Sequence, residues 1–309
     1  MSSPQEDPRQ TPTQRSFAFL VNPTSGGGAA PAAVVTVARI LRDAGAVVDV
    51  TYSPGPKATL DLVAAAVERG DVVVSVGGDG MLSSIAGEVA RLGGVLAIVP
   101  AGRGNDFARM LGLPESPEEI ASVLLEAAPT PTDLLEATLA DGSTRVVAGS
   151  VYAGVDAQTA ALVNRLHWLP KKLQYPAATV KSLATFRPTT YTVSIDGLTR
   201  SFLGATVVVA NSGYYGKGMH IAPNASVDDG ELDVIVIEAA GRVGMIRAFP
   251  KVYDGRHVDL EQVHVFRGRS VTVAGSPPVA MGGDGEPMAA LGAEPVRIDV
   301  RPGAVRILR

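Results

Sequence analysis

The sequence contains no cysteine and only one tryptophan, and no part of it approaches the roughly 20 consecutive apolar residues of a membrane span. Without cysteine, disulfides and thiolate metal sites are excluded, and the chain fits a reducing cytoplasm. A formal net charge of -4 argues against a protein that binds nucleic acid through bulk attraction to phosphate. Residues 1–15 are polar and lack the apolar segment of a signal peptide, so we expect a disordered tail. The length of 309 residues predicts two domains.

Residues 16–131 alternate between short apolar runs and longer segments with helical spacing. The apolar runs predict strands at residues 17–22, 46–52, 71–76 and 95–100. The segments between them predict helices at residues 31–45, 57–70 and 81–93, each ending on a glycine. The third strand is apolar on both faces, as expected between two layers of helices. This half therefore predicts a doubly wound parallel α/β domain, in which ligands bind at the carboxyl ends of the strands.

The sequence pattern changes in residues 132–309, where strand-like runs follow one another directly. The Asp-Gly pairs that begin at Asp141 and Asp196 are typical of hairpin turns. The strand-like runs are residues 205–213, 231–239, 264–275 and 296–308, and two helices are expected near residues 157–165 and 173–186. We therefore expect a β-rich second domain that begins near Pro129 and Pro131, with a last strand able to pack back on the first domain.

Three glycine-rich loops each follow a strand of the first domain: NPTSGGG from Asn22, VGGDG from Val76 and PAGRGND from Pro100. Glycines there let the backbone approach a ligand, and helix N-termini supply unpaired N–H groups. Three such loops at one sheet edge favour a polyphosphate site, with simple tight turns as the alternative. The chain has no G-x-x-x-x-G-K-[ST] motif, no dinucleotide fingerprint and no G-x-S-x-G elbow, and its four histidines show no paired metal spacing.

Two of these loops carry acidic residues, Asp79 and Asp106. A carboxylate beside a phosphate cradle is repulsive unless a cation lies between them. Mg²⁺ is the natural cation, since it favours one or two carboxylates together with phosphate oxygens and water. For Asp106, an Asx turn or a helix cap ahead of the segment FARML is the alternative. The first domain thus indicates a phosphate site with magnesium.

The order of these motifs resembles the diacylglycerol kinase catalytic-domain family. The motifs are NPTSGGG, VGGDG, PAGRGNDFAR, GMHIAPNASVDDGELDV and GGDGEP, and the resemblance spans residues 17–309. GGDG alone is weak, because NAD kinases and phosphofructokinases share it. The family includes soluble bacterial diacylglycerol and phosphatidylglycerol kinases as well as sphingosine and ceramide kinases. The resemblance implies an NAD kinase- or phosphofructokinase-like α/β domain, a C-terminal β-sandwich and an active-site cleft between them. In that cleft, ATP would donate its γ-phosphoryl group to a lipid hydroxyl.

Motif by motif, the resemblance assigns roles to residues of this chain. Those implied in ATP binding are Asn22, Pro23, Thr24, Ser25, Gly26, Thr51, Gly77, Gly78, Asp79, Gly80 and Arg103. Asp79 and Asp106 match acidic residues needed for Mg·ATP, and Glu286 matches a glutamate thought to be the general base. That role is physically reasonable, since a carboxylate can accept the proton of the attacking hydroxyl. A structural Mg²⁺ would bind the side chain of Asp229 and the backbone of Ser226 and Glu231.

The chain departs from the family pattern in two loops. GGDG is commonly followed by Thr and, two residues on, by Asn-Glu, whereas this chain has Met81, Ser83 and Ser84 there. Arg103 replaces a nucleotide-contacting threonine, and an arginine could bind phosphate or an anionic lipid head group. Two alternatives to a lipid kinase therefore stay open. One is a kinase of a soluble acceptor, such as NAD or a sugar-like metabolite, and the other is a non-catalytic nucleotide-binding protein.

The segment NRLHWLPKKLQY holds the one tryptophan, Trp168, close to Lys171 and Lys172. An aromatic side chain beside basic residues suits a protein that rests on an anionic membrane. A tryptophan packed in the second domain, with solvated lysines, is the alternative. We expect a cytoplasmic protein in peripheral contact with the inner membrane face, and a homodimer is compatible with this expectation.

The tetrapeptide GGDG occurs twice, at residues 77–80 and 282–285. The first copy lies between a buried strand and a helix. The second follows the strand-like segment PVAM and precedes Pro287, so it ends a strand and turns. A tight turn there would direct Glu286 toward the cleft, with an exposed hairpin glutamate as the alternative. We predict that the two copies form opposite walls of one cleft.

Overall fold

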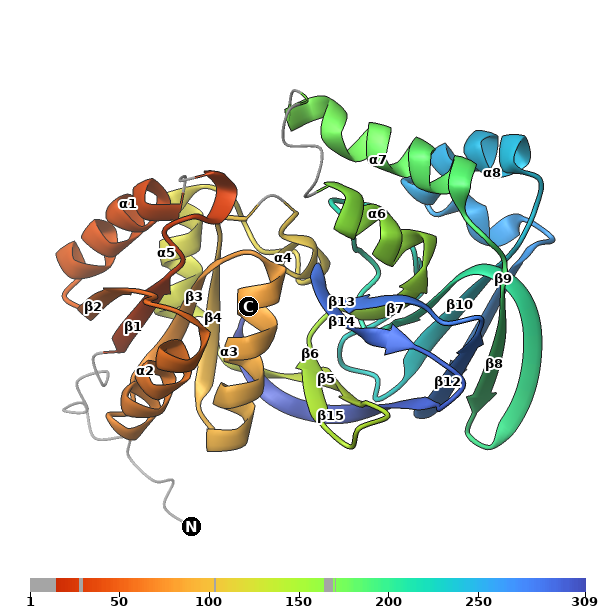
Figure 1. Ribbon diagram of the computed structural model, residues 1–309. Coiled ribbons are helices and arrows are strands. Elements are labelled where there is room, and N and C mark those ends of the chain that lie inside the picture. The colour runs from red at the N-terminus through yellow and green to blue at the C-terminus, as the bar shows by residue number, and fades with distance from the viewer. Residues whose placement is uncertain (1–14, 28–29, 103, 164–168, 170) are drawn as a thin grey trace, which may run out of the picture.

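The computed structural model describes residues 15–27, 30–102, 104–163, 169 and 171–309 (Figure 1). The first domain has four parallel strands in the order β4-β3-β1-β2. They are β1 (Ser16–Val21), β2 (Val47–Tyr52), β3 (Val72–Gly77) and β4 (Val95–Pro100). The helices on the sheet are α1 (Ala30–Asp43), α2 (Pro56–Glu68), α3 (Asp79–Leu92) and α5 (Pro117–Glu126). A short 3₁₀ turn (Ser25–Gly27) and α4 (Asp106–Met110) lie in its loops.

The side chains of β1 alternate between two layers of helices. Phe17, Phe19 and Val21 pack with α1 and α5, whereas Ala18 and Leu20 pack with α2 and α3. All five are buried, because a parallel strand in the middle of an α/β domain is covered on both faces. The predicted doubly wound parallel domain is confirmed (Figure 1).

Among the helices that cover the first sheet, two differ from the sequence expectation. α3 begins at Asp79, two residues before the predicted start, because Gly78 is extended and caps the helix directly. The second, α5, does not appear among the predicted helices. Its start is a capping box, in which the N–H of Glu119 donates to Ser116 Oγ (3.3 Å) and the Ser116 hydroxyl donates to the Glu119 carboxylate (2.6 Å). That signal is present in the sequence as S-P-E-E.

The second domain is built mainly from antiparallel strands around a largely aliphatic core, with two smaller buried clusters beside it. The strands are β5 (Pro129–Thr138), β6 (Thr144–Val147), β7 (Ser150–Gly154), β8 (Thr189–Ile195), β9 (Leu198–Ala210), β10 (Leu232–Glu238), β11 (Val263–Gly268), β12 (Ser270–Ser276), β13 (Val279–Gly283), β14 (Glu286–Leu291) and β15 (Val296–Leu308). The helices are α6 (Val155–Val163), α7 (Lys171–Thr185) and α8 (Arg242–Ala248), with 3₁₀ turns at Phe249–Val252 and Arg256–Asp259. In Figure 1 these helices lie together along one side of the strands.

The predicted strand at residues 264–275 is in fact two strands. β11 pairs with β10, whereas β12 pairs with β8 and β15. The chain changes partner at Gly268, where a β-carbon would lie 2.4 Å from Cγ2 of Ile195. A side chain does not fit there, so the glycine permits the change of direction. The sequence shows one nearly continuous strand pattern over residues 264–275, so the change of partner cannot be read from it.

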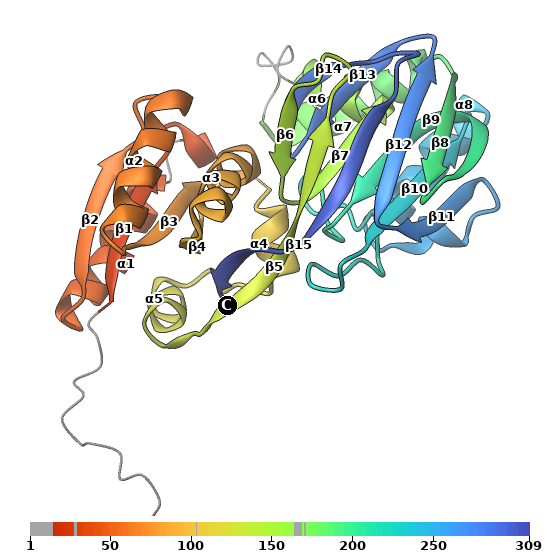
Figure 2. The same ribbon diagram turned by 90° about the horizontal axis from the view of Figure 1, so that it is seen from below.

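The last strand joins the two domains. β15 pairs antiparallel with β5, and its end pairs with β4 of the first sheet at Arg306 and Ile307. Figure 2 shows β5 and β15 running together from the first domain into the second. Both domains therefore share one hydrogen-bonded path of strands, and these two strands set how the domains face each other.

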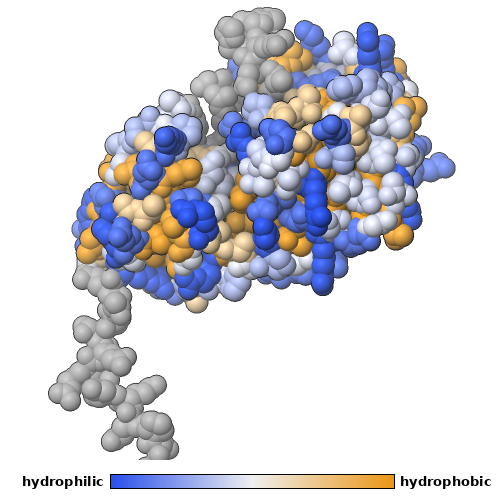
Figure 3. Space-filling view, turned by 60° about the horizontal axis from the view of Figure 1, so that its bottom comes forward, coloured by the Kyte–Doolittle hydropathy of each residue, from blue (hydrophilic) through white to orange (hydrophobic). Residues whose placement is uncertain are grey.

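The surface mixes residue types over both domains. On the face seen in Figure 3, hydrophobic residues lie interspersed with hydrophilic ones. Within the described part of the chain, none of the helices is both long enough and apolar enough to span a bilayer.

Candidate active site

The three glycine-rich loops of the first domain meet at one edge of the sheet. A β-carbon at Gly102 would lie 2.6 Å from the Cα of Gly78, so the loops after β4 and β3 are in backbone contact. From Gly78, a β-carbon would point at Ser25 Oγ (3.8 Å) in the loop after β1. Only a glycine at position 102 lets its backbone come this close to the backbone of Gly78. The loops thus form one surface, as the parallel strand order predicts.

The N-terminus of α3 opens onto this surface. Gly78 caps the helix without a side chain, so the cap residue supplies no side-chain oxygen for the first N–H groups. Such groups and the helix dipole favour a negatively charged ligand. In the neighbouring loop, the Asn22 side-chain oxygen accepts the N–H of Thr24 (3.0 Å) and its hydroxyl (2.9 Å), which fixes that turn. The arrangement suits a phosphate group.

Asp79 and Asp106 lie together beside Gly104. A β-carbon on Gly104 would be 3.2 Å from Asp79 Oδ2 and 3.0 Å from Asp106 Oδ2. Burial raises the pKa of the Asp79 carboxyl, against a hydrogen bond from the N–H of Phe107 (3.2 Å). Burial also raises the pKa of Asp106, and the charge of Asp79 raises it further. Two carboxylates that repel each other in this way form a natural place for a divalent cation.

Asp106 also connects the two domains. Its carboxylate oxygens accept the N–H groups of Lys217 (2.8 Å) and Gly218 (2.6 Å), which belong to the second domain. It stands in the first turn of α4, where Asn105 is the cap residue and accepts the N–H of Gly102 (2.7 Å). Asp106 therefore does not cap the helix, because Asn105 holds the cap position and the Asp106 carboxylate accepts N–H groups of the second domain.

The second GGDG forms a hairpin turn opposite the first. Asp284 (φ 45°) and Gly285 (φ 85°) join β13 to β14, and Glu286 is the first residue of β14. The Glu286 side chain lies against α3, because a β-carbon on Gly80 would come within 2.7 Å of Glu286 Cγ and Oε1. Asp79 is the neighbour of Gly80, so both motifs line one cleft.

Asp284 holds this hairpin in place. Its carboxylate accepts the N–H groups of Ala148, Gly149 and Ser150, each at 2.9 Å, and the hydroxyl of Ser83. Burial raises the pKa of Asp284 to about 6, and the hydrogen bonds from Ser83, Gly149 and Ser150 oppose that rise. Both GGDG aspartates line the cleft, but they differ in their bonds, since the carboxylate of Asp284 anchors a turn.

The cleft between the domains has a volume of about 370 Å³. Of the residues expected to hold nucleotide, those that line it are Asn22, Thr24, Ser25, Gly26, Gly78, Asp79 and Gly80. Pro23 and Gly77 flank this set without lining the cleft. Thr51 lies away from the lining, on β2 beside Leu20. Arg103 lies outside the described residues.

Several residues of the cleft wall come from the second domain and are absent from the sequence expectation. They are Tyr152, Asp156, Tyr214, Tyr215 and Lys217. Asp156 follows the end of β7 at Gly154 and stands in the first turn of α6. This strand-glycine-helix order is the same signal that identified the loops of the first domain. It could have pointed to Asp156.

An apolar cavity of about 510 Å³ adjoins the polar cleft. Asp156 and Tyr215 line both spaces, so the two meet there. Most of the cavity wall is hydrophobic, including Leu183, Ala205 and Met219. The carboxyl of Asp156 accepts the Thr206 hydroxyl (2.6 Å), and burial raises its pKa. The site thus combines a polar cleft with an apolar cavity.

Sequence comparison identifies the family. Residues 16–137 match the diacylglycerol kinase catalytic domain, and residues 149–309 match the YegS C-terminal NAD kinase beta sandwich-like domain. Diacylglycerol kinase of Mycobacterium tuberculosis is 32% identical over 294 residues, which cover 94% of each chain. The chain belongs to the diacylglycerol kinase family. The diacylglycerol kinase of Bacillus subtilis is 25% identical over 234 residues, 72% of this chain and 73% of that protein.

A solved structure agrees with the family in fold. A crystal structure of a diacylglycerol kinase from Bacillus anthracis superposes with a TM-score of 0.72 at 18% sequence identity, and covers 97% of this chain and 98% of that one. The expected family and the expected architecture, an α/β domain followed by a β-sandwich, are confirmed.

In the loop of the expected structural magnesium site, the side chains bond one another and Arg267. Ser226 donates its hydroxyl to Asp228 (2.6 Å), and both oxygens of Asp229 are engaged, one by the N–H of Glu231 (3.0 Å) and the other by Arg267. No group of three or more His, Cys, Asp or Glu side chains with the arrangement of a metal site occurs among the described residues. Of the three expected ligands, the side chain of Asp229 bonds an arginine.

Proposed function

We propose that this protein is an ATP-dependent lipid kinase that transfers the γ-phosphoryl group to a hydroxyl of diacylglycerol or a related lipid. The contact between Glu286 and Gly80 carries the proposal. It brings a carboxylate of the second domain to the N-terminus of α3, one residue from Asp79. A phosphate-binding wall and a base on the opposite wall are the two parts that phosphoryl transfer to an alcohol needs.

On the donor side, the loops after β1, β3 and β4 would hold the phosphates of ATP through backbone N–H groups. Asp79 and Asp106 fit a Mg²⁺ ion, since it favours one or two carboxylates together with phosphate oxygens. When bound, Mg²⁺ would neutralise charge on the transferring phosphoryl group. The cleft of about 370 Å³ lies within the range of ligand sites.

On the acceptor side, Glu286 would accept the proton of the attacking hydroxyl. The acceptor oxygen forms a bond to the γ-phosphorus, the bond from that phosphorus to the oxygen of ADP breaks, and the proton passes to the Glu286 carboxylate. Glu286 is exposed at the rim of the cleft, so an incoming hydroxyl can reach it. Asp284 keeps the base in position through the turn that it anchors.

The adjoining apolar cavity favours a lipid acceptor over a soluble one. NAD or a sugar-like metabolite would need a deep polar pocket, whereas this cavity is lined mainly by hydrophobic side chains. It meets the cleft at Asp156 and Tyr215, so an acyl chain inside it could leave its polar end close to the cleft.

Contact with a membrane surface is part of the proposal. The expected contact residue Trp168 lies outside the described residues, and the side chains of Lys171 and Lys172 at the start of α7 are likewise not described. Binding to liposomes tests this part, because a variant with Trp168→Ala, Lys171→Glu and Lys172→Glu should bind anionic vesicles less than the unmodified protein. Equal binding would remove it.

The main experiment supplies the protein with radiolabelled ATP, Mg²⁺ and a panel of lipids. We expect label in at least one lipid, and Glu286→Gln should lose most turnover while ATP affinity is kept. Glu294→Gln changes an exposed glutamate of the following turn and serves as the control. Tight ATP binding without transfer to any lipid would contradict the proposal. A Glu286→Gln variant with unchanged turnover would contradict the role of the base.

A further inference from the structure

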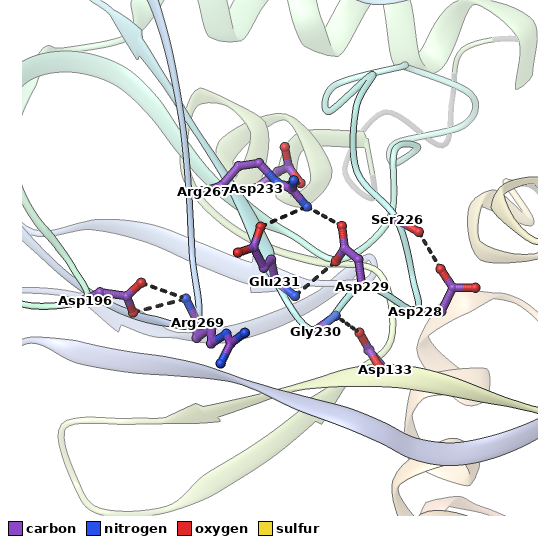
Figure 4. Close-up of polar contacts among 10 residues, drawn as sticks. All are labelled: Asp133, Asp196, Ser226, Asp228, Asp229, Gly230, Glu231, Asp233, Arg267 and Arg269. Carbon is purple, nitrogen blue, oxygen red and sulfur yellow. Dashed lines mark hydrogen bonds and ion pairs between the residues drawn. The ribbon is translucent and has the colours of Figure 1, made fainter.

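Arg267 lies among three carboxylates of the second domain (Figure 4). Its guanidinium bonds Asp229, lies 3.2 Å from Glu231 Oε2 and 3.6 Å from Asp233 Oδ2. Asp233 is buried, and the other two are partly exposed. A planar guanidinium with several N–H donors can satisfy more than one carboxylate at once, which a smaller ammonium group does less well.

The sheet places Arg267 there. It stands directly opposite Asp233 in the antiparallel pair of β10 and β11, so the two side chains lie on the same face of neighbouring strands. Asp229 and Glu231 come from the loop that leads into β10. The position of the cation therefore follows from strand register and does not depend on a ligand.

This loop also holds the two strands that join the domains. The N–H of Gly230 donates to one oxygen of Asp133 on β5 (2.7 Å), and the N–H of Gly303 in β15 donates to the other (2.6 Å). The backbone N–H of Asp133 donates to the carbonyl of Val227 (2.7 Å). Asp133 is buried, so these bonds are shielded from water. The conformation of the loop is therefore coupled to β5 and β15, the two strands that set how the domains face each other.

A divalent cation on the same carboxylates would lie beside the guanidinium, and two like charges repel. Asp229 Oδ2 can bind Arg267 or a metal ion, and its other oxygen already accepts the N–H of Glu231. We propose that Arg267 supplies the positive charge that this loop needs. The hydrogen bonds of Asp133 that hold β5 and β15 to the loop would then form without a metal ion. In this chain, magnesium would then be needed only at the cleft.

Thermal unfolding of the nucleotide-free protein tests the proposal without any use of kinase activity. With a cleft carboxylate removed by Asp79→Asn, the protein should have the same Tm in EDTA as in millimolar Mg²⁺ or Ca²⁺. Arg267→Met should lower the Tm in EDTA by about 4 °C and should regain most of it when either cation is added. Arg267→Lys keeps the charge and, combined with Asp79→Asn, should stay independent of metal. Arg269→Met removes an exposed arginine outside the cluster and should behave as the unmodified protein.

Two further variants assign any metal response to its site. In the Arg267→Met background, Asp229→Asn should abolish the rescue by cations, whereas Asp79→Asn in the cleft should leave it. A Tm of the unmodified protein that rises with Mg²⁺ or Ca²⁺, and stops rising in Asp229→Asn, would overturn the proposal. An Arg267→Met protein that ignores both cations would overturn it as well. If that variant folds only with a divalent cation present, the proposal is supported.

Discussion

The hydroxyl of Ser83 on α3 donates a hydrogen bond to the carboxylate of Asp284 in the turn between β13 and β14. This bond ties the helix that begins in the first GGDG to the second GGDG. The N–H of Ala148 donates to both partners, at 3.1 Å to Ser83 and 2.9 Å to Asp284. Ser83 is one of the residues at which the chain departs from the family pattern, and it connects the two walls of the cleft.

Removal of the Ser83 hydroxyl should loosen that connection. We expect Ser83→Ala to lower the free energy of unfolding by about 1–2 kcal/mol, because a buried carboxylate loses one hydrogen bond. Turnover should fall roughly tenfold, since the turn before Glu286 becomes less fixed, and the KM for ATP should change little. Urea unfolding and steady-state kinetics measure both. Ser84→Ala is the control, because Ser84 bonds only the exposed carbonyl of Gly80 (3.2 Å) in its own helix.

A methyl group at Gly80 should displace the proposed base. The new β-carbon would lie 2.7 Å from Glu286 Cγ and Oε1, and the flexible glutamate side chain would give way. Gly80→Ala should therefore reduce kcat at least tenfold while the midpoint of urea unfolding stays nearly constant. Gly292→Ala, where a β-carbon meets nothing within 4 Å, is the matched control. Full kcat in Gly80→Ala would separate Glu286 from the chemistry.

The sequence predicted the first domain closely because its elements are regular. Apolar runs and terminal glycines marked four strands and three helices, and parallel order then required their loops to meet at one edge. It predicted less of the second domain. The change of partner at Gly268 depends on contact with Ile195, more than 70 residues away in the chain, and local periodicity carries no such information.

The same limit explains why the sequence did not predict Arg267 as the cation beside the loop before β10. The segment SVDDGE suggested a metal because it resembles the structural magnesium site of the family. Arg267 reaches them only through the pairing of β10 with β11, which no short motif records. By contrast, the contact of the two GGDG copies could be predicted, because each marks a turn at the same cleft.

The raised pKa of Asp284 predicts a dependence of stability on pH. The folded value is about 6 against an ordinary value of 3.8, so the folded protein binds an extra proton between these limits. Stability from this group is fully present below pH 3.8 and is lost as the pH rises through about 6, by up to about 3 kcal/mol. Asp79 contributes to the same shift through its charge.

Asp284→Asn should remove that fall in stability. Urea unfolding at a series of pH values between 4 and 7 should give a flatter profile for the variant than for the unmodified protein, whatever their absolute stabilities. Asp141→Asn provides the control, since Asp141 is exposed in a loop and hydrogen bonds from Ser143 lower its pKa. Parallel profiles for Asp284→Asn and the unmodified protein would mean that the carboxylate is ionised throughout this range.

Filling the apolar cavity should change which acceptors react. Ala205 is buried in the cavity wall, and Ala205→Phe would occupy part of its volume of about 510 Å³. If an acyl chain lies in this cavity, the variant should lose at least tenfold in kcat/KM for a long-chain diacylglycerol, less for a short-chain one, and nothing in ATP affinity, because the cleft is untouched. Val243→Phe adds the same ring at an exposed position on α8 outside the cavity and controls for surface hydrophobicity. An equal loss for long and short chains would mean that the acyl chain stays outside the protein.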